Sequence, residues 1–480
     1  MQHGLELLNE LDTEDIDWMM NNANEQQVIA NTSLIEEGSK PDSLYFVLEG
    51  MVGVYVSSLE HKQITTLGPG EVFGEMSFLS DDPASATVQA VENSLLLAIP
   101  HSELHLRMKE MPDFAARLYR AFALMAHDRL RNNVDTMGRI WSQKAAAEDH
   151  DNETWTEIHA QMQQFKALMQ EADREALKND NIVPEELAEQ IVGGFRQFSK
   201  FMNEKIGDDS PENPYIKDEL GARIQRELLP YILLSGIAER IYAKPRGYAG
   251  DFMTIELLYE NDPKGTSRLG PLLDRCFLKE PAALAVRNRR GLLVEEIKKV
   301  LDKSQGTVRV TSLASGPAAE LFDVFEQLED TTRLKTTLVD IDLQALAFVG
   351  DKRDKLKLTR QMEMFNGNLV YLATGRQKMD ARPQDLVYSI GLIDYFSDKF
   401  VIMLLNYVHG LLKPGGKVIL GNFHPKNTSK ALMDHVIDWK LIHRTEDEMC
   451  NLFESSAFGK RCTEMRYEPE GVNLFAACIK

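Results

Sequence analysis

The sequence is poor in the features that mark secreted, metal-binding and membrane-spanning proteins. Its 480 residues contain four cysteines and no CxxC spacing, which fits a reducing cytoplasm and gives no metal motif. No apolar run approaches the ~18 residues of a transmembrane helix. The first residues are polar and acidic, unlike a secretory signal. We therefore predict a cytoplasmic protein without a membrane span or metal site, in which four cysteines are free thiols: Cys276, Cys450, Cys462 and Cys478.

Positive charge is also scarce. The chain has 54 Lys and Arg against 74 Asp and Glu, a formal charge of −20. Because phosphate contacts need clustered Lys and Arg, this balance argues against nucleic acids and anionic membranes as general partners. The apolar fraction of 43% and the charged fraction of 27% are ordinary for a globular protein. Since a domain averages about 150 residues, the length predicts two or three domains.

Three styles of sequence follow one another along the chain. Short apolar runs between Gly, Pro, Asn and Asp over residues 30–100 predict a compact antiparallel β domain. Helical periodicity fills residues 101–242, and strands alternate with helices over residues 285–480, which predicts a covered parallel sheet. The predicted multidomain fold therefore has an antiparallel β-roll with flanking helices (1–135), a helical connector or lid (136–242) and a Rossmann-like α/β domain (243–480).

Two glycine-bounded motifs frame the β region. One runs from Gly38 to Gly50 (GSKPDSLYFVLEG), and the other runs from Gly68 to Glu75 (GPGEVFGE). Their order, with a helix after them, resembles the cyclic-nucleotide-binding domain over residues 5–130. The resemblance implies an anion nest of backbone N–H groups, with Glu75 holding a ribose 2′-hydroxyl. The implied sensor pocket consists of Gly74, Glu75, Met76, Ser85, Ala86 and Thr87.

The implied pocket departs from that family at one position. Ala84 stands where the family places an arginine that pairs with the cyclic phosphate. The loss of a charge-assisted bond of about 1.5–3 kcal/mol weakens binding roughly ten- to a hundred-fold. Asp81 and Asp82 add repulsion, and no Lys or Arg within residues 80–89 replaces the missing charge. Cyclic AMP, a different ligand, and a module that only dimerises or transmits contacts all stay open.

The segment His101–Asn133 is predicted to form a helix after the β-roll. In the cyclic-nucleotide-binding family this helix often forms a dimer interface, so a homodimer is one interpretation. Packing into the chain's own core is the other, and the sequence does not choose between them. The apolar residues that recur at helical spacing are Leu104, Met108, Met111, Phe114, Leu118, Phe122 and Met125.

A strand followed by a small-residue turn opens the C-terminal region. Residues 307–313 run into ASGPA (314–318), and a helix begins at Leu321. Such a turn lets the backbone approach a ligand at a helix N-terminus. A second strand ends at Asp340, where a carboxylate can accept both ribose hydroxyls of a nucleoside. Asp342 is a nearby alternative or a helix N-cap.

Later segments extend this pattern. FNGN (365–368) suits a turn near an adenine, residues 385–396 indicate a fourth strand and its loop, and residues 412–423 a turn into a fifth strand. This order resembles class I S-adenosylmethionine-dependent methyltransferases, and the GxGxxG of dinucleotide dehydrogenases is absent. The resemblance implies S-adenosylmethionine as cofactor. The implied cofactor-binding residues are Ala314, Gly316, Ala318, Asp340, Asp342, Asn366, Ser389 and Gly391.

Three unusual segments carry a closer resemblance: KPRGYAGDF (244–252), NFHP (422–425) and DWKLIHRTE (438–446). They are similar to bacterial methyltransferases for biosynthesis of the extracellular factor 3-hydroxypalmitic acid methyl ester, over residues 210–480. That resemblance implies methylation of the carboxylate of a 3-hydroxy fatty acid. The product would be a diffusible signal ester.

A carboxylate acceptor sets modest chemical demands on the site. It is ionised at pH 7 and needs no general base, so rate comes mostly from in-line positioning. The site should offer hydrogen bonds or a cation, and an apolar channel. The candidates for these roles are Arg246, Tyr248, Tyr395, His424 and Arg444. We predict Tyr248, Tyr395 and His424 as the catalytic acceptor-pocket groups, and Arg444 with Glu446 as a structural pair.

Other interpretations remain. A hydroxyl or amine acceptor would need a base, with His424 or Tyr248 as the first candidates. His424 also fits a cap at the end of a strand. The competing function is a non-catalytic, cyclic-nucleotide-responsive regulatory or interaction protein that uses a methyltransferase-like fold as its effector.

Overall fold

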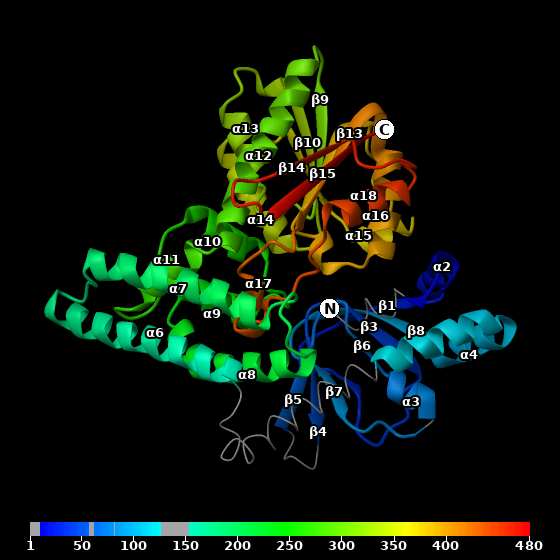
Figure 1. Cartoon of the computed structure of the whole chain (residues 1–480). Coiled ribbons are helices and arrows are strands. Elements are labelled where there is room, and N and C mark those ends of the chain that lie inside the picture. Colours follow the sequence, from blue (N-terminus) through cyan, green and yellow to red (C-terminus); the bar gives the residue numbers. More distant parts are fainter. Residues whose placement is uncertain (1–9, 57–61, 81, 126–152) are drawn as a thin grey trace. The chain divides into compact units, whose positions relative to one another are not determined.

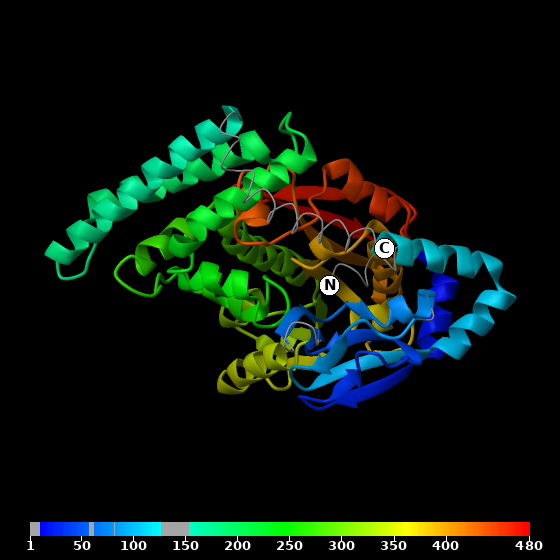
Figure 2. The same ribbon diagram turned by 90° about the horizontal axis from the view of Figure 1, so that it is seen from below.

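The computed structural model describes residues 10–56, 62–80, 82–125 and 153–480. The chain divides into two compact units. The first unit contains residues 1–145 and 245–248, and the second contains residues 146–244 and 249–480. Figure 1 and Figure 2 show the elements of both units, each of which is described by itself.

The first unit is built on two four-stranded sheets, with strand orders β1-β8-β3-β6 and β2-β7-β4-β5. Every strand pair in them is antiparallel, which confirms the predicted antiparallel β domain. The inward side chains include Val47, Val52 and Leu96, which are fully buried. The strands are β1 (Asn24–Val28), β2 (Ser33–Ile35), β3 (Ser43–Glu49), β4 (Val52–Val56), β5 (Lys62–Leu67), β6 (Val72–Phe73), β7 (Thr87–Ala90) and β8 (Ser94–Pro100). The helices include α2 (Thr13–Asn21), α3 (Glu75–Ser80) and α4 (His101–Glu110).

The single helix predicted over His101–Asn133 is interrupted. Helix α4 ends at Glu110, and residues 112–125 are helical again. Pro112 explains the break, because a proline pushes the residue before it out of the helical region. Five residues of the predicted apolar stripe are fully buried within the chain: Leu104, Phe114, Leu118, Phe122 and Met125. Intramolecular packing therefore accounts for them, and the part of the prediction beyond residue 125 lies outside the described residues.

Helices before the sheet of the second unit pack around a shared core. Helices α6 and α7 lie side by side (Figures 1 and 2). Their core also contains Phe423 and Trp439 from the sheet region, so the helices and the sheet form one unit. The helices are α6 (Glu153–Lys178), α7 (Glu185–Ile206), α8 (Pro214–Ile232), α9 (Gly236–Ala243), α10 (Phe252–Glu260), α11 (Gly270–Leu278) and α12 (Pro281–Lys303).

The second unit contains a seven-stranded sheet in the order β11-β10-β9-β12-β13-β15-β14. Its strands are β9 (Val308–Leu313), β10 (Leu334–Asp340), β11 (Met362–Asn366), β12 (Gln384–Ile390), β13 (Leu412–Phe423), β14 (Glu464–Tyr467) and β15 (Asn473–Ile479). Strands β9 to β13 are parallel, as predicted. Strand β15 is antiparallel to β13 and β14, so the sheet is mixed and the predicted parallel pairing holds only for β9 to β13. The short link 468–472 explains this, because a parallel crossover needs a dozen or more residues.

Helices cover both faces of this sheet. Alternate side chains of the strands divide between two cores, as the period of two requires: Leu386 and Tyr388 face one, and Val387 faces the other. Helices α12, α13 (Ala319–Glu326) and α14 (Leu343–Lys355) cover the first face. Helices α15 (Leu369–Ala373), α16 (Asp398–Leu411) and α18 (Glu446–Glu454) cover the second. Helix α17 (Lys430–His435) instead packs on α7 and α8.

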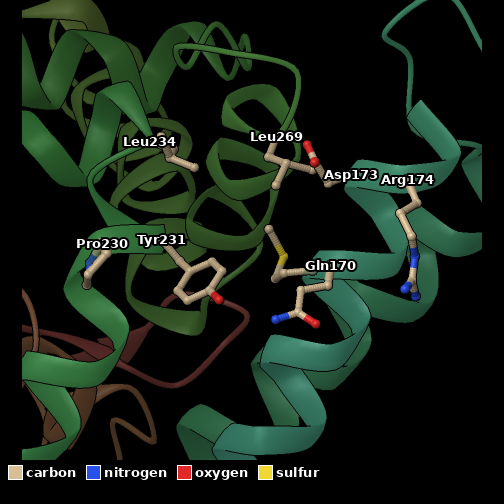
Figure 3. Close-up of a pocket in the computed structure, with 8 residues that line it drawn as sticks. Gln170, Asp173, Arg174, Pro230, Tyr231, Leu234 and Leu269 are labelled. Atoms are coloured by element: carbon tan, nitrogen blue, oxygen red, sulfur yellow. The ribbon is translucent and has the colours of Figure 1, made fainter. Parts of the chain in front are cut away.

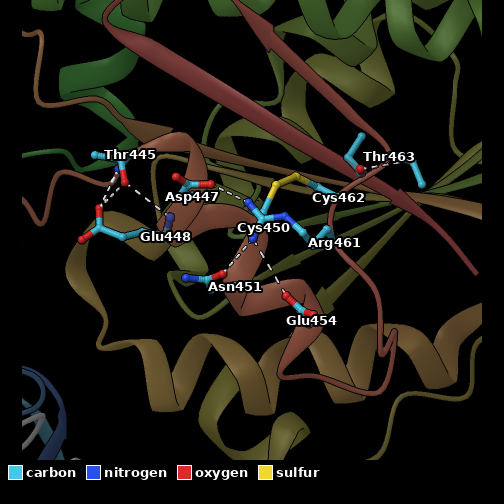
Figure 4. The surroundings of a disulfide bond; sticks show 10 residues. Thr445, Asp447, Glu448, Cys450, Asn451, Glu454, Arg461, Cys462 and Thr463 are labelled. Atoms are coloured by element: carbon cyan, nitrogen blue, oxygen red, sulfur yellow. Dashed lines mark hydrogen bonds and ion pairs between the residues drawn. A yellow bond between two sulfur atoms is a disulfide. The ribbon is translucent and has the colours of Figure 1, made fainter.

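A disulfide corrects the prediction of four free thiols. Cys450 of α18 is bonded to Cys462, which lies in the segment that leads to β14 (Figure 4). Arg461 beside it pairs with Asp447 at 2.5 Å and donates to Asn451 at 3.1 Å. The spacing of twelve residues does not predict this pairing, because the two thiols meet only through the fold of the chain after α18. Cys276 and Cys478 are free and buried.

Within the described residues, no helix combines the length and the apolar character needed to cross a bilayer.

Removing the disulfide should lower the free energy of unfolding. Closing a loop of this length restricts the unfolded chain, which corresponds to about 3 kcal/mol in the chain-entropy model. We expect the double variant Cys450→Ser, Cys462→Ser to lose roughly this amount in urea denaturation under oxidising conditions. Reductant should destabilise the native chain and leave the double variant unchanged. Equal stability of the two proteins without reductant would contradict the bond's role.

Candidate functional site

The turn after β9 has a backbone that is unusual for its sequence. Ala314, Gly316 and Ala318 all have φ between 50° and 52°, a left-handed region that ordinarily suits glycine. Each alanine held there costs on the order of 1–3 kcal/mol, and such strain clusters at ligand-binding sites. Open space lies in front of Gly316, where an added Cβ would meet no atom within 4 Å. The Ser315 hydroxyl is buried and has no hydrogen-bond partner among the described residues.

Asp340 at the end of β10 holds this turn in place. Its Oδ2 accepts a hydrogen bond from the Gly316 N–H at 2.9 Å, and its Oδ1 accepts one from the Asp342 N–H at 2.9 Å. Burial raises the pKa of Asp340 to about 6. Two backbone bonds leave further lone pairs on the carboxylate, which has about four acceptor sites. Asp340 can therefore orient the turn and still accept hydroxyl groups of a ligand.

The other predicted cofactor residues lie along the same edge of the sheet. Asp342 caps α14, accepting from the Gln344 N–H at 2.8 Å, which was the alternative role considered for it. Asn366 donates to the Ile341 carbonyl at 2.9 Å and ties the ends of β10 and β11 together. Ser389 is buried and donates to the Leu313 carbonyl at 3.1 Å, linking β12 to β9. Contact of these residues with a cofactor stays a prediction.

His424 is held by two neighbours. Its Nδ1 accepts from the Lys426 N–H at 3.1 Å, so its Nε2 carries the proton and donates to Glu446 at 3.0 Å. The ring is 4% exposed. Hydrogen bonds from Tyr467 and His424 lower the pKa of Glu446 to about 2, which keeps it ionised. With both nitrogens occupied, His424 caps the end of β13 in this arrangement.

The Tyr395 hydroxyl has a hydrogen-bond partner within the chain. It accepts from the Trp439 indole N–H at 2.8 Å, and burial raises its pKa well above the ordinary value. The hydroxyl therefore stays protonated at neutral pH. An added Cβ at Gly250 would meet that hydroxyl at 2.7 Å, so only glycine fits beside it. Tyr248, two residues earlier, groups with the first unit, and its place in the site stays a prediction.

Arg444 is a structural residue, with partners that differ from the predicted one. It is 2% exposed and pairs with Asp398 at 2.9 Å rather than with Glu446. It also donates to the Ile393 carbonyl at 2.9 Å and to Asn422 Oδ1 at 2.8 Å. The same guanidinium therefore ties the loop after β12 to the end of β13.

Two buried charged residues at this edge were missed from the sequence. Asp394 is 1% exposed; its Oδ1 accepts from the Phe423 N–H at 2.6 Å, and its Oδ2 has no partner among the described residues. Arg289 of α12 is 4% exposed and lies against Gly391, where an added Cβ would meet Nη1 at 2.8 Å. Neither Asp394 nor Arg289 belongs to a recognisable sequence motif. Arg289 reaches the ends of the strands only because α12 packs there in the folded chain.

The predicted sensor-pocket residues lie on two segments of the first unit. Gly74 has φ of +90°, and an added Cβ would meet the Ser43 carbonyl oxygen at 2.7 Å, so glycine is required there. Glu75 begins α3 and is 5% exposed, whereas Met76 is 60% exposed. On the second segment, Ser85, Ala86 and Thr87 enter β7, and Thr87 Oγ1 accepts from the Glu37 N–H at 3.1 Å.

A separate hollow of about 470 Å³ lies in the helical part of the second unit. Side chains of α6 face the end of α8 and Leu269 across it (Figure 3). No residue of the strand ends lines it. Its polar residues include Asp173, which is paired with Arg268 at 2.6 Å. In the described part of the chain, no group of His, Cys, Asp or Glu side chains is placed to hold a metal ion.

The buried carboxyl of Asp394 should give unfolding a specific pH dependence. Burial raises its pKa to about 6, against about 3.9 when unfolded, so between pH 4 and 6 the folded state keeps a proton that the unfolded state has lost. Stability contributed by this group therefore falls as pH rises through that window, by at most about 1.4 kcal/mol per pH unit. Asp394→Asn keeps the Oδ1 acceptor but cannot titrate. In urea denaturation at several pH values, the free energy of unfolding of the variant should rise relative to that of the native chain from pH 4 to 6. A constant difference between the two proteins over this range would contradict the prediction.

Comparison with known proteins adds two matches. Residues 25–110 match the family “Cyclic nucleotide-binding domain”, and residues 246–476 match the family “Putative methyltransferase”. The chain is 29% identical over 117 residues to the cyclic AMP receptor protein of Thermus thermophilus, which is 24% of this chain and 54% of that protein. It is 33% identical over 97 residues to a cyclic nucleotide-gated potassium channel of Mesorhizobium japonicum, which is 20% of this chain and 26% of that protein.

Among solved structures, a possible exported protein from Bordetella parapertussis shares 20% identity with a TM-score of 0.43. The match covers 61% of this chain and 96% of that protein. The chain spans about half the length of the first of these two curated relatives and about a quarter of the length of the second. The chain therefore joins an N-terminal cyclic nucleotide-binding domain to a C-terminal region that matches the “Putative methyltransferase” family.

Proposed function

We propose that the C-terminal region transfers a methyl group from S-adenosylmethionine to a carboxylate, such as that of a 3-hydroxy fatty acid. The observation that carries this proposal is the bond between Asp340 and the strained turn at Gly316. In open α/β sheets, ligands bind outside the carboxyl ends of the strands where the strand order reverses. Here that point lies between β9 and β12, next to the turn.

The residues at this point fit a nucleoside with an amino-acid arm. Asp340 has acceptor sites left for ribose hydroxyls, and the space before Gly316 admits close approach of a ligand to the backbone. Within the part of the chain that the structure describes, the buried Ser315 hydroxyl has no partner, and a bound polar group would supply one. Ala314, Gly316 and Ala318 would border the amino-acid arm, while Asn366, Ser389 and Gly391 would shape the walls.

S-adenosylmethionine supplies a methyl group already activated by its positive sulfur. A carboxylate oxygen forms the new bond to the methyl carbon as the carbon–sulfur bond breaks. The electron pair goes to sulfur, which becomes a neutral thioether, and the carboxylate becomes a methyl ester. No proton moves, so the chain needs to hold the reacting groups in line rather than to supply a base. This agrees with His424, whose two nitrogens are both occupied.

We further propose that the N-terminal domain binds a small regulatory ligand and has weak affinity for cyclic AMP. Ala84 carries no charge for the cyclic phosphate, and the exposed Asp82, two residues before it in the sequence, repels anions. The Ala84 backbone pairs with Gly38 and Ser39, so the segment keeps a defined position without the arginine. Transmission to the second unit requires a ligand that binds two arrangements of the chain unequally.

The competing proposal is a regulatory protein that binds S-adenosylmethionine without turnover. Tyr395 and His424 favour it in one respect, because both polar groups are engaged within the chain. The two proposals differ in product formation and agree in cofactor binding.

Calorimetric titration with S-adenosylmethionine and S-adenosylhomocysteine tests the cofactor assignment. We expect micromolar binding of both, weakened at least tenfold by Asp340→Ala, because a charge-assisted hydrogen bond contributes about 1.5–3 kcal/mol. Asp330→Asn, at the exposed start of the segment before β10, is the matched control and should bind normally. If the native chain bound neither compound, both the enzymatic and the non-catalytic proposals would fall. Ester formation from 3-hydroxy fatty acids then separates the two.

Restoring a charge at position 84 should raise the affinity for cyclic AMP. We expect Ala84→Arg to bind it roughly ten- to a hundred-fold more tightly than the native chain, in the same calorimetric format. Ala84→Gln has a similar length without charge and should show no gain. Tight binding by the native chain would overturn the proposed weak affinity.

A further inference from the structure

Arg289 is a buried cation at the point where the strand order reverses. It lies on α12, which packs on β9 and β12, and only 4% of it is exposed. An added Cβ at Gly391, the first residue after β12, would come within 2.8 Å of Nη1 and 3.2 Å of Nη2. Both ends of the planar guanidinium therefore lie against the loop that closes one side of the proposed cofactor site.

This guanidinium is poorly neutralised by the protein. In the described part of the chain, no carboxylate lies within 4.0 Å of it, and its Nε is buried without a hydrogen-bond partner. Tyr259 is a polar neighbour: burial raises the pKa of its hydroxyl, and the positive charge of Arg289 opposes that rise. Guanidinium has five N–H donors, so one phenol leaves most of them unused.

Burial raises the pKa of two carboxyl groups, Glu320 and Asp394, and the charge of Arg289 opposes that rise, but both have other hydrogen-bond partners. Glu320 accepts from the Tyr388 hydroxyl at 2.6 Å, and its pKa is raised by burial. Asp394 is bonded to the Phe423 N–H, and its pKa is raised to about 6 by burial. Neither forms an ion pair with Arg289. A buried arginine without a paired carboxylate is costly unless a ligand supplies the missing charge.

We propose that Arg289 binds the carboxylate of a ligand in the crevice between β9 and β12. The inference rests on the proposed function for the identity of the ligands. Two carboxylates meet in that crevice: the one on the amino-acid arm of the cofactor and the one on the acceptor. The fork of Arg289 matches a carboxylate with two parallel hydrogen bonds, which a lysine cannot form.

Three probes distinguish the sources in the full-length chain. S-adenosylhomocysteine carries the amino-acid carboxylate, and 5′-methylthioadenosine is the same thioether nucleoside without it. The third probe is 3-hydroxydecanoate, with its uncharged methyl ester as reference. Calorimetric affinities are measured for the native chain, Arg289→Gln and Arg289→Lys. We expect a ten- to hundred-fold loss for a probe whose carboxylate Arg289 binds, with partial retention by Arg289→Lys.

The neighbouring arginine provides the control. Arg290 pairs with Asp323 through Nε at 2.5 Å and through Nη2 at 2.6 Å, so it is already neutralised. Arg290→Gln should therefore leave the affinities for all three probes unchanged. Thermal unfolding of each variant, together with its affinity for 5′-methylthioadenosine, reports whether the fold of the site is intact.

Each outcome decides the proposal. Loss of S-adenosylhomocysteine binding with normal 5′-methylthioadenosine binding assigns Arg289 to the cofactor. Loss of 3-hydroxydecanoate binding alone assigns it to the acceptor. Native affinities in Arg289→Gln, or equal losses for charged and uncharged probes, overturn it. If the native chain binds neither nucleoside, the proposed function fails, and Arg289 is then judged on 3-hydroxydecanoate: an Arg289-dependent affinity supports it, and no affinity overturns it.

Discussion

Parallel strand pairing is the constraint on which the second unit depends. Strands β9 to β13 run in one direction, so each must be followed by a crossover, and all five end at the same edge. The order reverses between β9 and β12, so the loops after these two strands turn away from each other. The reversal of strand order therefore separates the Gly316 turn from the Gly391 loop, and the crevice between them follows from the topology of the sheet.

Charge at this edge is buried in a way that few core positions tolerate. Asp340, Asp394, Arg289 and Arg444 are each less than a tenth exposed. Arg444 is fully engaged by Asp398, Asn422 and carbonyl oxygens, and it serves the fold. Asp340 and Asp394 are each only partly engaged, and Arg289 is the least satisfied of the four. The contrast separates a structural arginine from one that has capacity for a ligand.

Each unit has a turn with positive φ at its predicted ligand site, but the residues that adopt this φ differ. In the first, Gly74 takes a positive φ where a side chain would collide with the Ser43 carbonyl. In the second, alanines occupy the same backbone region at Ala314 and Ala318, so strain accompanies the turn there. The cyclic nucleotide-binding domain keeps its architecture although Ala84 replaces the charged residue expected for a cyclic phosphate.

The sequence by itself determined the elements whose signal is local. Strand-like runs that alternate with helical segments identified the strands ending at Leu313 and Asp340. Small residues identified the turn after the first of these strands, and glycine-bounded runs identified the N-terminal β domain. The signal for the helix break, Pro112, is also local, but the helical periodicity on both sides of it led to the prediction of a single helix. Tertiary structure decided what depends on contacts between distant segments. Four features join residues that share no sequence motif. They are the Cys450–Cys462 bond, the antiparallel pairing of β15, the hydrogen bond between His424 and Glu446, and the approach of Arg289 to Gly391. Local patterns report backbone preference and burial, whereas pairing between segments depends on how the chain closes around its core.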